Sequence, residues 1–584
     1  MIPDSFVWGA ATSAYQIEGG RHEGGKGDSI WDTFSDMGRL KDPGDQTCDS
    51  FHRWKEDLDL LEDLGVDGYR FSVAWSRVFP DGDGDLNREG LDFYKRMVHG
   101  MRDRGIDPYL TLYHWDLPQA LQDKGGWASR ATADAFVRYA GVMAEELGDE
   151  VKEWITHNEP WVASMLGHKD GVFAPGIEDW QTAVAAAHHI LLSHGRAVPV
   201  IRDRAPDARV GLAIDCRPVR PASRSDEDVA AARHFDGFRN RWFFDPVFGL
   251  GYPIDMLNSY EAMDRIPPGL FHDTDLEEIS VPIDFLGLNY YTTIEVGVGA
   301  EENEGSDVEP THEPPPGYTE MGWRIDPRGL TDYLVHLKRT YRPRSILITE
   351  NGASYSDAPD RNGVVDDRRR ISYLARHIQA VEEAIGAGVP VDGYFVWSLL
   401  DNLEWTHGFD QRFGLVWVDQ RTFERIPKRS FDWYADVIVN GGLALADREE
   451  IEIPIPRAQP ATGRFDVSER LESWMDRYVA AWTSNNPDQI SALFTEDAVY
   501  DPQTADGEIH GIEQIIDWWL DIDDRPDNWD FEWLPLVESD DLAVVVGNTK
   551  YLDPEANYRN LFVIRFDDSG LCRDFTEWYI EEQP

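Results

Sequence analysis

Eight short runs rich in Val, Ile, Leu and aromatic residues recur through the first 445 residues of this 584-residue chain. They occupy residues 6–11, 68–75, 108–115, 153–158, 209–216, 284–291, 345–350 and 393–399. Helical periodicity fills intervals between them, at 50–64, 87–104, 131–147, 180–203 and 371–387. This alternation is typical of α/β proteins, and eight strand–helix units predict a closed, parallel (β/α)8 TIM barrel with long loops. The alternative is an open doubly wound sheet, but no Gly-x-Gly-x-x-Gly turn opens its first unit.

The pattern changes after residue 446. The stretch 447–463 carries three prolines and no helical periodicity, which predicts a linker. The remainder, 464–584, begins with helical patterns at 467–485 and 487–494 and continues with strand patterns at 498–500, 531–538, 542–551, 559–567 and 574–579. Helices followed by antiparallel strands predict a separate α+β domain. We therefore expect a barrel at 1–446, a Pro-rich linker at 447–463 and a smaller α+β domain at 464–584.

The chain is strongly acidic, with 108 Asp and Glu residues against 55 Lys and Arg residues and a formal net charge of −53. Such a charge repels phosphate backbones and anionic lipid headgroups, which argues against nucleic-acid and membrane partners. Only 10 of the basic residues are lysines, and acidic residues run through every segment. This composition resembles that of proteins from salt-accumulating halophiles, and the alternative is an acidic mesophilic protein.

Three cysteines, Cys48, Cys216 and Cys572, lie far apart without CxxC spacing. We therefore expect neither a disulfide framework nor a zinc site. The first residues lack a basic region before an apolar stretch, and no run of about 18 apolar residues follows. We expect a soluble, cytoplasmic protein that requires no metal and no cofactor.

Two glutamates close predicted strands: Glu159 in Ile-Thr-His-Asn-Glu-Pro-Trp and Glu350 in Ile-Leu-Ile-Thr-Glu-Asn-Gly. A carboxylate at the C-terminal end of a barrel strand points into the barrel mouth, where the catalytic groups of such folds lie. Either glutamate alone is equally consistent with a capping or salt-bridged surface acid. Two of them together suggest acid/base and nucleophilic chemistry on a glycosidic bond.

Seven motifs follow one another along the predicted barrel. They are FVWGAATSAYQIEG (6–19), GYRFSVAWSRVFP (68–80), YHWDLP (113–118), THNEPW (156–161), FLGLNYY (285–291), ITENG (348–352) and WSLLDNLEW (397–405). In this order they resemble glycoside hydrolase family 1, the family of β-glucosidases and β-galactosidases. The resemblance implies a retaining mechanism, with Glu159 as general acid/base and Glu350 as nucleophile. Retaining carboxyls lie about 5–5.5 Å apart, where two charges repel by roughly 3 kcal/mol, so ionised Glu350 would keep Glu159 protonated.

The resemblance also implies roles for the residues around the sugar. The expected partners of the sugar ring are the hydrogen-bonding groups of Gln16, His114, Asn158 and Glu404, with Trp405 beside them and Trp397 as the stacking platform. Tyr291 would orient Glu350, and Arg70 would hold it ionised. Asn289 would join that polar cluster, and Trp161 and Trp323 would line the aglycone side.

Glu404 also bears on the substrate, because its charge would repel the phosphate of a 6-phosphorylated sugar. We expect small β-glucosides, β-galactosides or short β-linked oligosaccharides as substrates. One alternative is a 6-phospho-β-glycosidase. Another is a non-catalytic sugar-binding barrel, which would lack one of the two glutamates, and both are present.

The second predicted domain carries RYVAAWTSNNPDQISALFTEDAVYDP (477–502), GEIHGIEQI (507–515) and FTEWY (575–579). These segments are similar to the SnoaL-like group, which shares the cone-shaped α+β fold of nuclear transport factor 2 and ketosteroid isomerase. His510, Asp497 and Asp501 could form an acid/base set, but a turn histidine and solvated acids explain them equally well. The resemblance implies a role in homo-oligomerisation or accessory binding.

Overall fold

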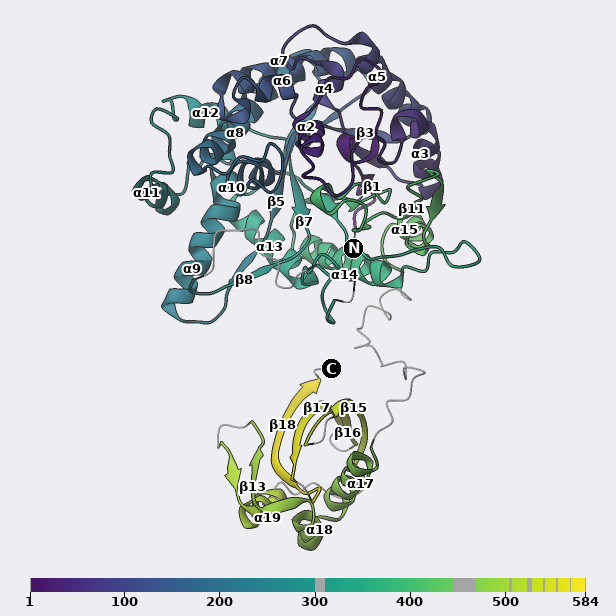
Figure 1. Cartoon of the computed structure of the whole chain (residues 1–584), viewed down its shortest axis with the longest axis vertical. Coiled ribbons are helices and arrows are strands. Elements are labelled where there is room, and N and C mark those ends of the chain that lie inside the picture. The colour runs from purple at the N-terminus through teal and green to yellow at the C-terminus, as the bar shows by residue number, and fades with distance from the viewer. Residues whose placement is uncertain are drawn as a thin grey trace. The chain divides into compact units, whose positions relative to one another are not determined.

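The computed structural model describes residues 2–299, 310–312, 314–444, 468–503, 507–521, 528–538, 541–552, 555–567 and 569–582. The chain divides into two compact units, Met1–Glu452 and Ile453–Pro584 (Figure 1). Each unit has a hydrophobic core of its own. The predicted linker, 447–463, lies outside the described residues.

The first unit is built around a closed barrel of parallel strands in the order β1-β10-β9-β7-β5-β4-β3-β2. These strands are β1 (Val7–Ala11), β2 (Gly68–Ser72), β3 (Asp107–Tyr113), β4 (Glu153–Asn158), β5 (Arg209–Cys216), β7 (Phe285–Tyr290), β9 (Ile346–Asn351) and β10 (Val391–Trp397). All eight predicted strands take part, so the predicted barrel is confirmed. Two further pairs join β6 (Val219–Pro221) to β8 (Ile294–Val296) and β11 (Val416–Val418) to β12 (Arg425–Pro427).

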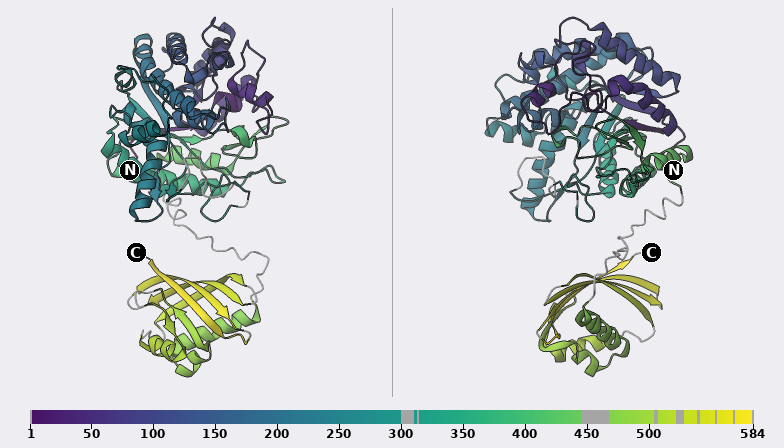
Figure 2. Two further views of the ribbon diagram at one scale, coloured as in Figure 1. Left: turned by 60° about the vertical axis from the view of Figure 1, so that its left-hand side comes forward. Right: turned by 45° about the vertical axis from the view of Figure 1, so that its right-hand side comes forward.

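Helices surround this barrel (Figure 2). The longer ones are α3 (Ser50–Leu64), α5 (Arg88–Asp103), α7 (Arg130–Leu147), α8 (Trp180–Arg204), α9 (Asp226–Asp236), α13 (Pro327–Thr340), α14 (Arg368–Gly386) and α15 (Arg429–Asn440). Shorter ones are α1 (Ala14–Ile17), α2 (Ile30–Asp36), α4 (Trp75–Val78), α6 (Gln119–Gln122), α10 (Trp242–Val247), α11 (Ile254–Ala262) and α12 (Asp275–Ile279). The five predicted helices are all present. Within the described ranges, no helix is both long enough and apolar enough to cross a membrane.

Three predicted strands are two or more residues too long at the carboxyl end, because the run 393–399 also ends early, at Trp397. The run 68–75 leaves the sheet after Ser72, and Trp75 already begins α4. The run 108–115 ends at Tyr113, because Trp115 adopts a φ of 76°, a left-handed conformation that a strand does not contain. At these two places the chain leaves the barrel, and buried Trp75 and Trp115 lie in the segments that follow the strands.

Side chains fill the interior of the barrel. Tyr109, Ile155, Phe285 and Phe395 belong to one buried cluster inside it. Gly68 allows the close approach of Tyr109, since a Cβ there would lie 2.6 Å from the tyrosine ring. A filled interior leaves the carboxyl-end mouth of the barrel as the place where a ligand can bind.

The second unit has a six-stranded sheet in the order β14-β13-β18-β17-β16-β15. Its strands are β13 (Phe494–Asp501), β14 (Ile509–His510), β15 (Trp529–Glu538), β16 (Leu542–Leu552), β17 (Glu555–Phe566) and β18 (Cys572–Glu582). The helices are α17 (Glu469–Ser484), α18 (Pro487–Ser491) and α19 (Ile512–Asp521), and they lie on one face of the sheet (Figure 2). An aromatic core that includes Trp474, Tyr478 and Phe575 joins the two layers. This arrangement confirms the predicted α+β domain.

Three details of the second unit differ from the prediction. The helix expected at 487–494 ends at Ser491, and Phe494 already starts β13. Helix α19 and the two-residue strand β14 were not predicted. The strand expected at 498–500 is part of the longer β13, which pairs in parallel with β18. Pairing with distant β18 extends this strand beyond its short apolar stretch, which is a tertiary effect.

Candidate active site

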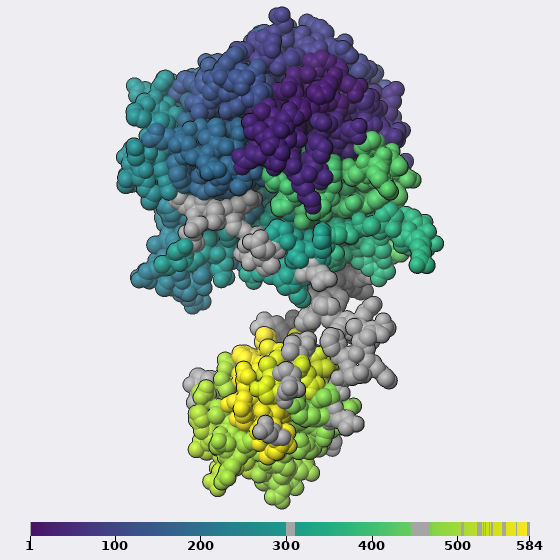
Figure 3. Space-filling model, viewed as in Figure 1, coloured from purple at the N-terminus to yellow at the C-terminus, as the bar shows by residue number. Residues whose placement is uncertain are grey.

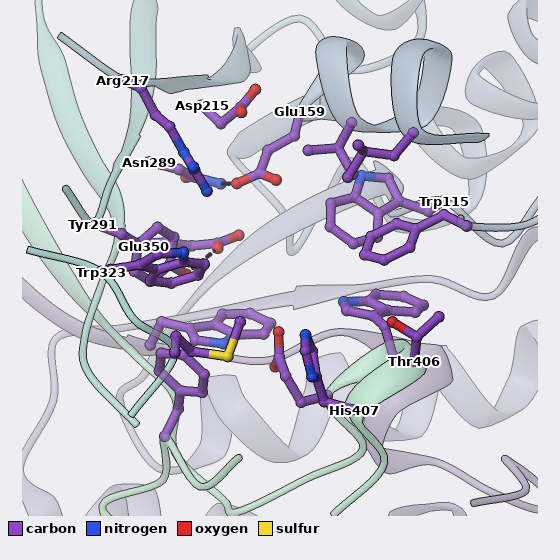
Figure 4. Close-up of a pocket in the computed structure, with 18 of the residues that line it drawn as sticks. Trp115, Glu159, Asp215, Arg217, Asn289, Tyr291, Trp323, Glu350, Thr406 and His407 are labelled. Carbon is purple, nitrogen blue, oxygen red and sulfur yellow. Dashed lines mark hydrogen bonds between the residues drawn. The ribbon is translucent and has the colours of Figure 1, made fainter. Parts of the chain in front are cut away.

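A cavity of about 330 Å³ opens in the first unit (Figure 4). Its size is typical of small-molecule pockets. The predicted site residues that line it are His114, Glu159, Asn289, Tyr291, Trp323, Glu350, Trp397, Glu404 and Trp405. Arg70, Asn158 and Gln16 are buried in the layer behind and reach the lining residues through hydrogen bonds.

Glu159 is the first residue beyond β4. It adopts a φ of 49°, and its backbone N–H donates to the carbonyl oxygen of Ala213 at 2.9 Å. A positive φ at a glutamate is strained, and this contact with β5 helps to fix it. The side chain accepts a hydrogen bond from Asn289 Nδ2 at 2.6 Å, so β4, β5 and β7 together aim the carboxyl group into the cavity.

Glu350 is the last residue but one of β9, and it is almost fully buried. It accepts a hydrogen bond from the Arg70 guanidinium, with which it forms an ion pair, and another from the Tyr291 hydroxyl at 2.7 Å. Arg70 is fully buried and also donates to Asn158 Oδ1 at 2.6 Å and to the Thr349 carbonyl at 3.1 Å. These bonds fix the guanidinium in place beside the carboxylate.

The two carboxyl groups experience different fields. Burial raises the pKa of Glu159 well above its ordinary value, and the negative charges of Asp215 and Glu350 raise it further. Burial also raises the pKa of Glu350, but Arg70 and the hydroxyl of Tyr291 oppose that rise. Of the two, Glu159 is therefore the group that holds a proton more firmly, while Glu350 has partners that favour its charge.

One wall of the cavity combines stacked rings with hydrogen-bonding groups. The His114 ring stacks with Trp397 at 5.8 Å and with Trp405 at 6.1 Å between ring centroids. Burial, with the nearby Arg70 charge, lowers the pKa of His114 well below its usual range, so the imidazole is neutral. Gln16 Nε2 donates to Asn402 Oδ1 at 3.0 Å and lies 3.5 Å from a Glu404 carboxyl oxygen. Flat rings with neutral and acidic hydrogen-bonding groups suit a pyranose.

The structure separates the two tryptophans that were predicted to line the aglycone side. Trp323 lines the cavity, 5.2 Å from the ring of Tyr291. Trp161 is fully buried one layer behind the wall, and the guanidinium of Arg239 lies over its ring at 3.7 Å. Arg239 is thus the residue that reaches the cavity at this point.

Several lining residues were not predicted. The charged ones are Asp215, Arg217 and Arg239, and the others include Trp115, Phe173, Met321, His407 and Phe413. Asp215 could have been found, because it is an acidic residue near the C-terminal end of a predicted strand, the feature that singled out Glu159. Arg239 lies between barrel strands in sequence, and no sequence pattern points to it.

A parallel barrel with two buried glutamates in unlike surroundings, next to stacked rings and sugar-compatible polar groups, defines a glycoside hydrolase. The model of glycosyl hydrolase family 1 matches residues 1–443, and the chain belongs to this family. The predicted resemblance is therefore confirmed.

Individual relatives agree. β-Glucosidase A of Acetivibrio thermocellus is 44% identical over 447 residues, which span 76% of this chain and 99% of that protein. β-Glucosidase A of Thermotoga maritima is 45% identical over 446 residues, 76% of this chain and 98% of that protein. The solved structure of the family 1 β-glucosidase from Thermotoga maritima superposes with a TM-score of 0.72, covering 76% of this chain and 98% of that one.

The second unit matches a different family model, that of the SnoaL-like domain, over residues 475–574. Among the polar residues considered for catalysis there, His510 of β14 pairs in register with Val499 of β13, two residues from both Asp497 and Asp501. His510 is 63% exposed and pairs with Glu508 at 3.4 Å, while Asp501 accepts from the Gln503 backbone. Within the described residues, the ion pair of His510 is with Glu508 and not with Asp497 or Asp501.

Proposed function

We propose that this protein is a retaining exo-β-glycosidase that removes glucose or galactose from small β-glycosides through a covalent glycosyl-enzyme. One observation carries the proposal: Glu159 and Glu350 line the same cavity, the former beside acidic groups and the latter against an arginine.

In the first step an ionised oxygen of Glu350 attacks the anomeric carbon. The bond from that carbon to the aglycone oxygen breaks, and the proton of Glu159 moves to the leaving oxygen. Glu350 is then a neutral ester, so Glu159 can hold a negative charge. In the second step Glu159 takes a proton from water, the water oxygen attacks the anomeric carbon and the ester bond breaks, which restores both groups.

The sugar at the cavity is proposed to be unphosphorylated. Glu404 lines the cavity and would repel a phosphate placed near it. The relatives named above are β-glucosidases, which supports glucosides as one substrate class. β-Galactosides remain in the proposal because a carboxylate accepts hydrogen bonds from either epimer. The 6-phospho-β-glycosidase and non-catalytic alternatives are less consistent with this carboxylate and with the intact pair of glutamates.

The stereochemistry of the product tests the mechanism. Proton NMR of a nitrophenyl β-glucoside digest should show the β-anomer of glucose first, followed by mutarotation. With azide added, Glu350→Ala should form the α-glycosyl azide, because azide occupies the space of the missing nucleophile. Glu159→Ala should form the β-glycosyl azide, because azide replaces water in the second step. Initial release of α-glucose by the wild type would refute the double displacement.

For the second unit we propose homodimerisation through the outer face of its sheet. The registers Leu534–Val546, Val546–Leu561 and Leu561–Trp578 align an apolar row across four strands. Leu534 is 52% exposed and Trp578 39% exposed, and the row points away from the helices, because the adjacent Val545 and Phe562 face the core. Figure 3 shows the C-terminal strands, in yellow, at the surface of this unit.

A second copy of the chain is the proposed occupant of that row. Two chains that each carry a net charge of −53 repel one another least where both surfaces are uncharged. Light scattering of the full chain and of a form without residues 456–584 tests this, and Trp578→Lys is the matched point variant. Dimers that become monomers in both variants support the proposal, and an unchanged oligomer in both overturns it.

We also propose that the acidic composition adapts the protein to concentrated salt. Dense carboxylates repel one another across the surface, and this repulsion is screened only when ions are abundant. Activity and ellipticity should therefore rise from dilute buffer to molar KCl. Full stability and activity without salt would favour an acidic mesophilic protein instead. The cytoplasmic location stays a prediction from the sequence.

A further inference from the structure

Next to the acid/base glutamate lies a buried ion pair that the steps above do not use. Asp215 lies near the end of β5, in register with Asn289 of β7, the residue that donates to Glu159. Its carboxylate pairs with the guanidinium of Arg239, from the helical turn Gly237–Arg241. The side chains are only 6% and 3% exposed, respectively. Both residues line the cavity.

The position of the pair is specific to one of the two glutamates. Asp215 lies on the same side of the cavity as Glu159 (Figure 4), and its charge acts on the Glu159 carboxyl group. Ala213, two residues before Asp215, accepts the hydrogen bond from the Glu159 backbone. Glu350, in contrast, is held on its own side by Arg70 and Tyr291.

The groups that surround Glu159 come from several elements. Asp215 and Cys216 belong to β5, Asn289 to β7, Glu350 to β9 and Arg239 to the turn after α9. Arg217 follows β5 and also lines the cavity (Figure 4), Tyr291 follows β7, and Arg70 of β2 lies behind Glu350. Among the charges, Asp215 and Glu350 raise the pKa of Glu159, whereas Arg239 lowers it. Asp215 and Arg239 therefore act on Glu159 with opposite sign.

Stability alone does not explain such a pair. A buried ion pair loses hydration on both partners, and apolar side chains of similar volume are often as stable. Arg239 is anchored by its stacking on Trp161 at 3.7 Å, which holds one charge of the pair at a fixed place beside the cavity.

We propose that Asp215 and Arg239 form a positioning pair that sets how firmly Glu159 holds the proton it gives to the leaving group. Asp215 keeps the proton on Glu159, and Arg239 limits this effect so that Glu159 can still ionise when it must activate water. The pair acts on Glu159 through its charges and not on the reacting atoms. This inference rests on the proposed acid/base role of Glu159.

The test is the pH dependence of kcat/KM for a β-glycoside with a poor leaving group. Activity is lost at high pH as free Glu159 loses its proton, so the basic limb of the profile reports Glu159. Asp215→Asn leaves Arg239 charged and unopposed, because arginine does not deprotonate in proteins. We expect the basic limb to move to lower pH by about one unit, with a smaller movement of the acidic limb.

The double variant Asp215→Asn, Arg239→Gln removes both charges and should bring the basic limb back toward that of the wild type. A folding defect would not shift the basic limb in the single variant and restore it in the double variant. The matched control is the buried pair of Asp57 and Arg425, at 3.0 Å with side chains 5% and 4% exposed, which does not line the cavity. Asp57→Asn should reduce thermal stability and leave both limbs in place.

Two results would overturn the inference: a basic limb that stays in place in folded Asp215→Asn, or one that the second substitution fails to restore. Failure of the proposed function is recognised separately, because Glu159→Ala would then keep wild-type activity toward the same poor substrate. With Glu159→Ala inactive and the Asp215→Asn limb unmoved, only the role of the pair is wrong.

Discussion

The two walls of the cavity use the same residue type for opposite tasks. On one wall Glu350 faces the buried cation of Arg70 and the hydroxyl of Tyr291, which favour its ionised form. On the other wall Glu159 faces an amide from Asn289 and the carboxylate of Asp215. The comparison teaches that surroundings, and not residue identity, decide which glutamate attacks and which one donates a proton.

The largest effect is expected from the loss of the attacking carboxylate, because no other group can replace it. Glu350→Ala removes the attacking oxygen, and kcat for nitrophenyl β-glucoside should fall by at least about 10⁴-fold. Steady-state assays with freshly purified, folded variant measure it. Turnover within tenfold of the wild type would show that Glu350 is not the nucleophile.

Loss of the general acid should affect substrates differently, according to their leaving groups. Glu159→Ala should lower kcat/KM by about 10²–10⁴-fold for a poor leaving group. For a dinitrophenyl glycoside the loss should be much smaller, because that phenolate leaves without a proton. Glu153→Ala is the control, since Glu153 begins the strand that Glu159 follows and pairs with Arg209 outside the cavity. Equal losses on both substrates would contradict the assignment of Glu159.

A smaller effect is expected from one hydrogen bond to Glu350. Tyr291→Phe removes the donor at 2.7 Å, and kcat/KM should fall by about 10–100-fold. That hydrogen bond lowers the pKa of Glu350, so its loss raises the pKa. Because Glu350 must be ionised, the acidic limb should move to higher pH. An acidic limb that stays in place or moves to lower pH would contradict this part of the account.

The smallest effect concerns the second unit. The residues that line the cavity lie between His114 and Phe413, all within the first unit. Removal of residues 456–584 should therefore leave kcat/KM for nitrophenyl β-glucoside within about twofold at a fixed salt concentration. A loss above tenfold in a folded barrel would show that the second unit contributes to the site.

The sequence predicts the barrel well because its signal is local. Each strand is a short apolar run, and the glutamates that end two of them are visible in the chain. What it does not predict depends on distant contacts. Trp161 lies one layer behind the wall because Arg239, 78 positions later in the chain, covers its ring. Helix α19 does not share that difficulty: Trp518 and Trp519 pack on Tyr500 of the preceding strand β13, so its apolar spacing could have been recognised in the sequence.

Asp215 is an intermediate case. The rule applied to Glu159 would have selected it, but its partner Arg239 cannot be identified from the sequence, because only the fold brings the two together.

The central claim is that the charge of Glu350 acts together with burial and Asp215 to keep a proton on Glu159. It is tested most directly by ¹³C NMR titration of the Glu159 carboxyl in the wild type and in Glu350→Gln. The account predicts that the pKa of Glu159 falls by about two units when the neighbouring charge is removed. An unchanged pKa in the variant would contradict it.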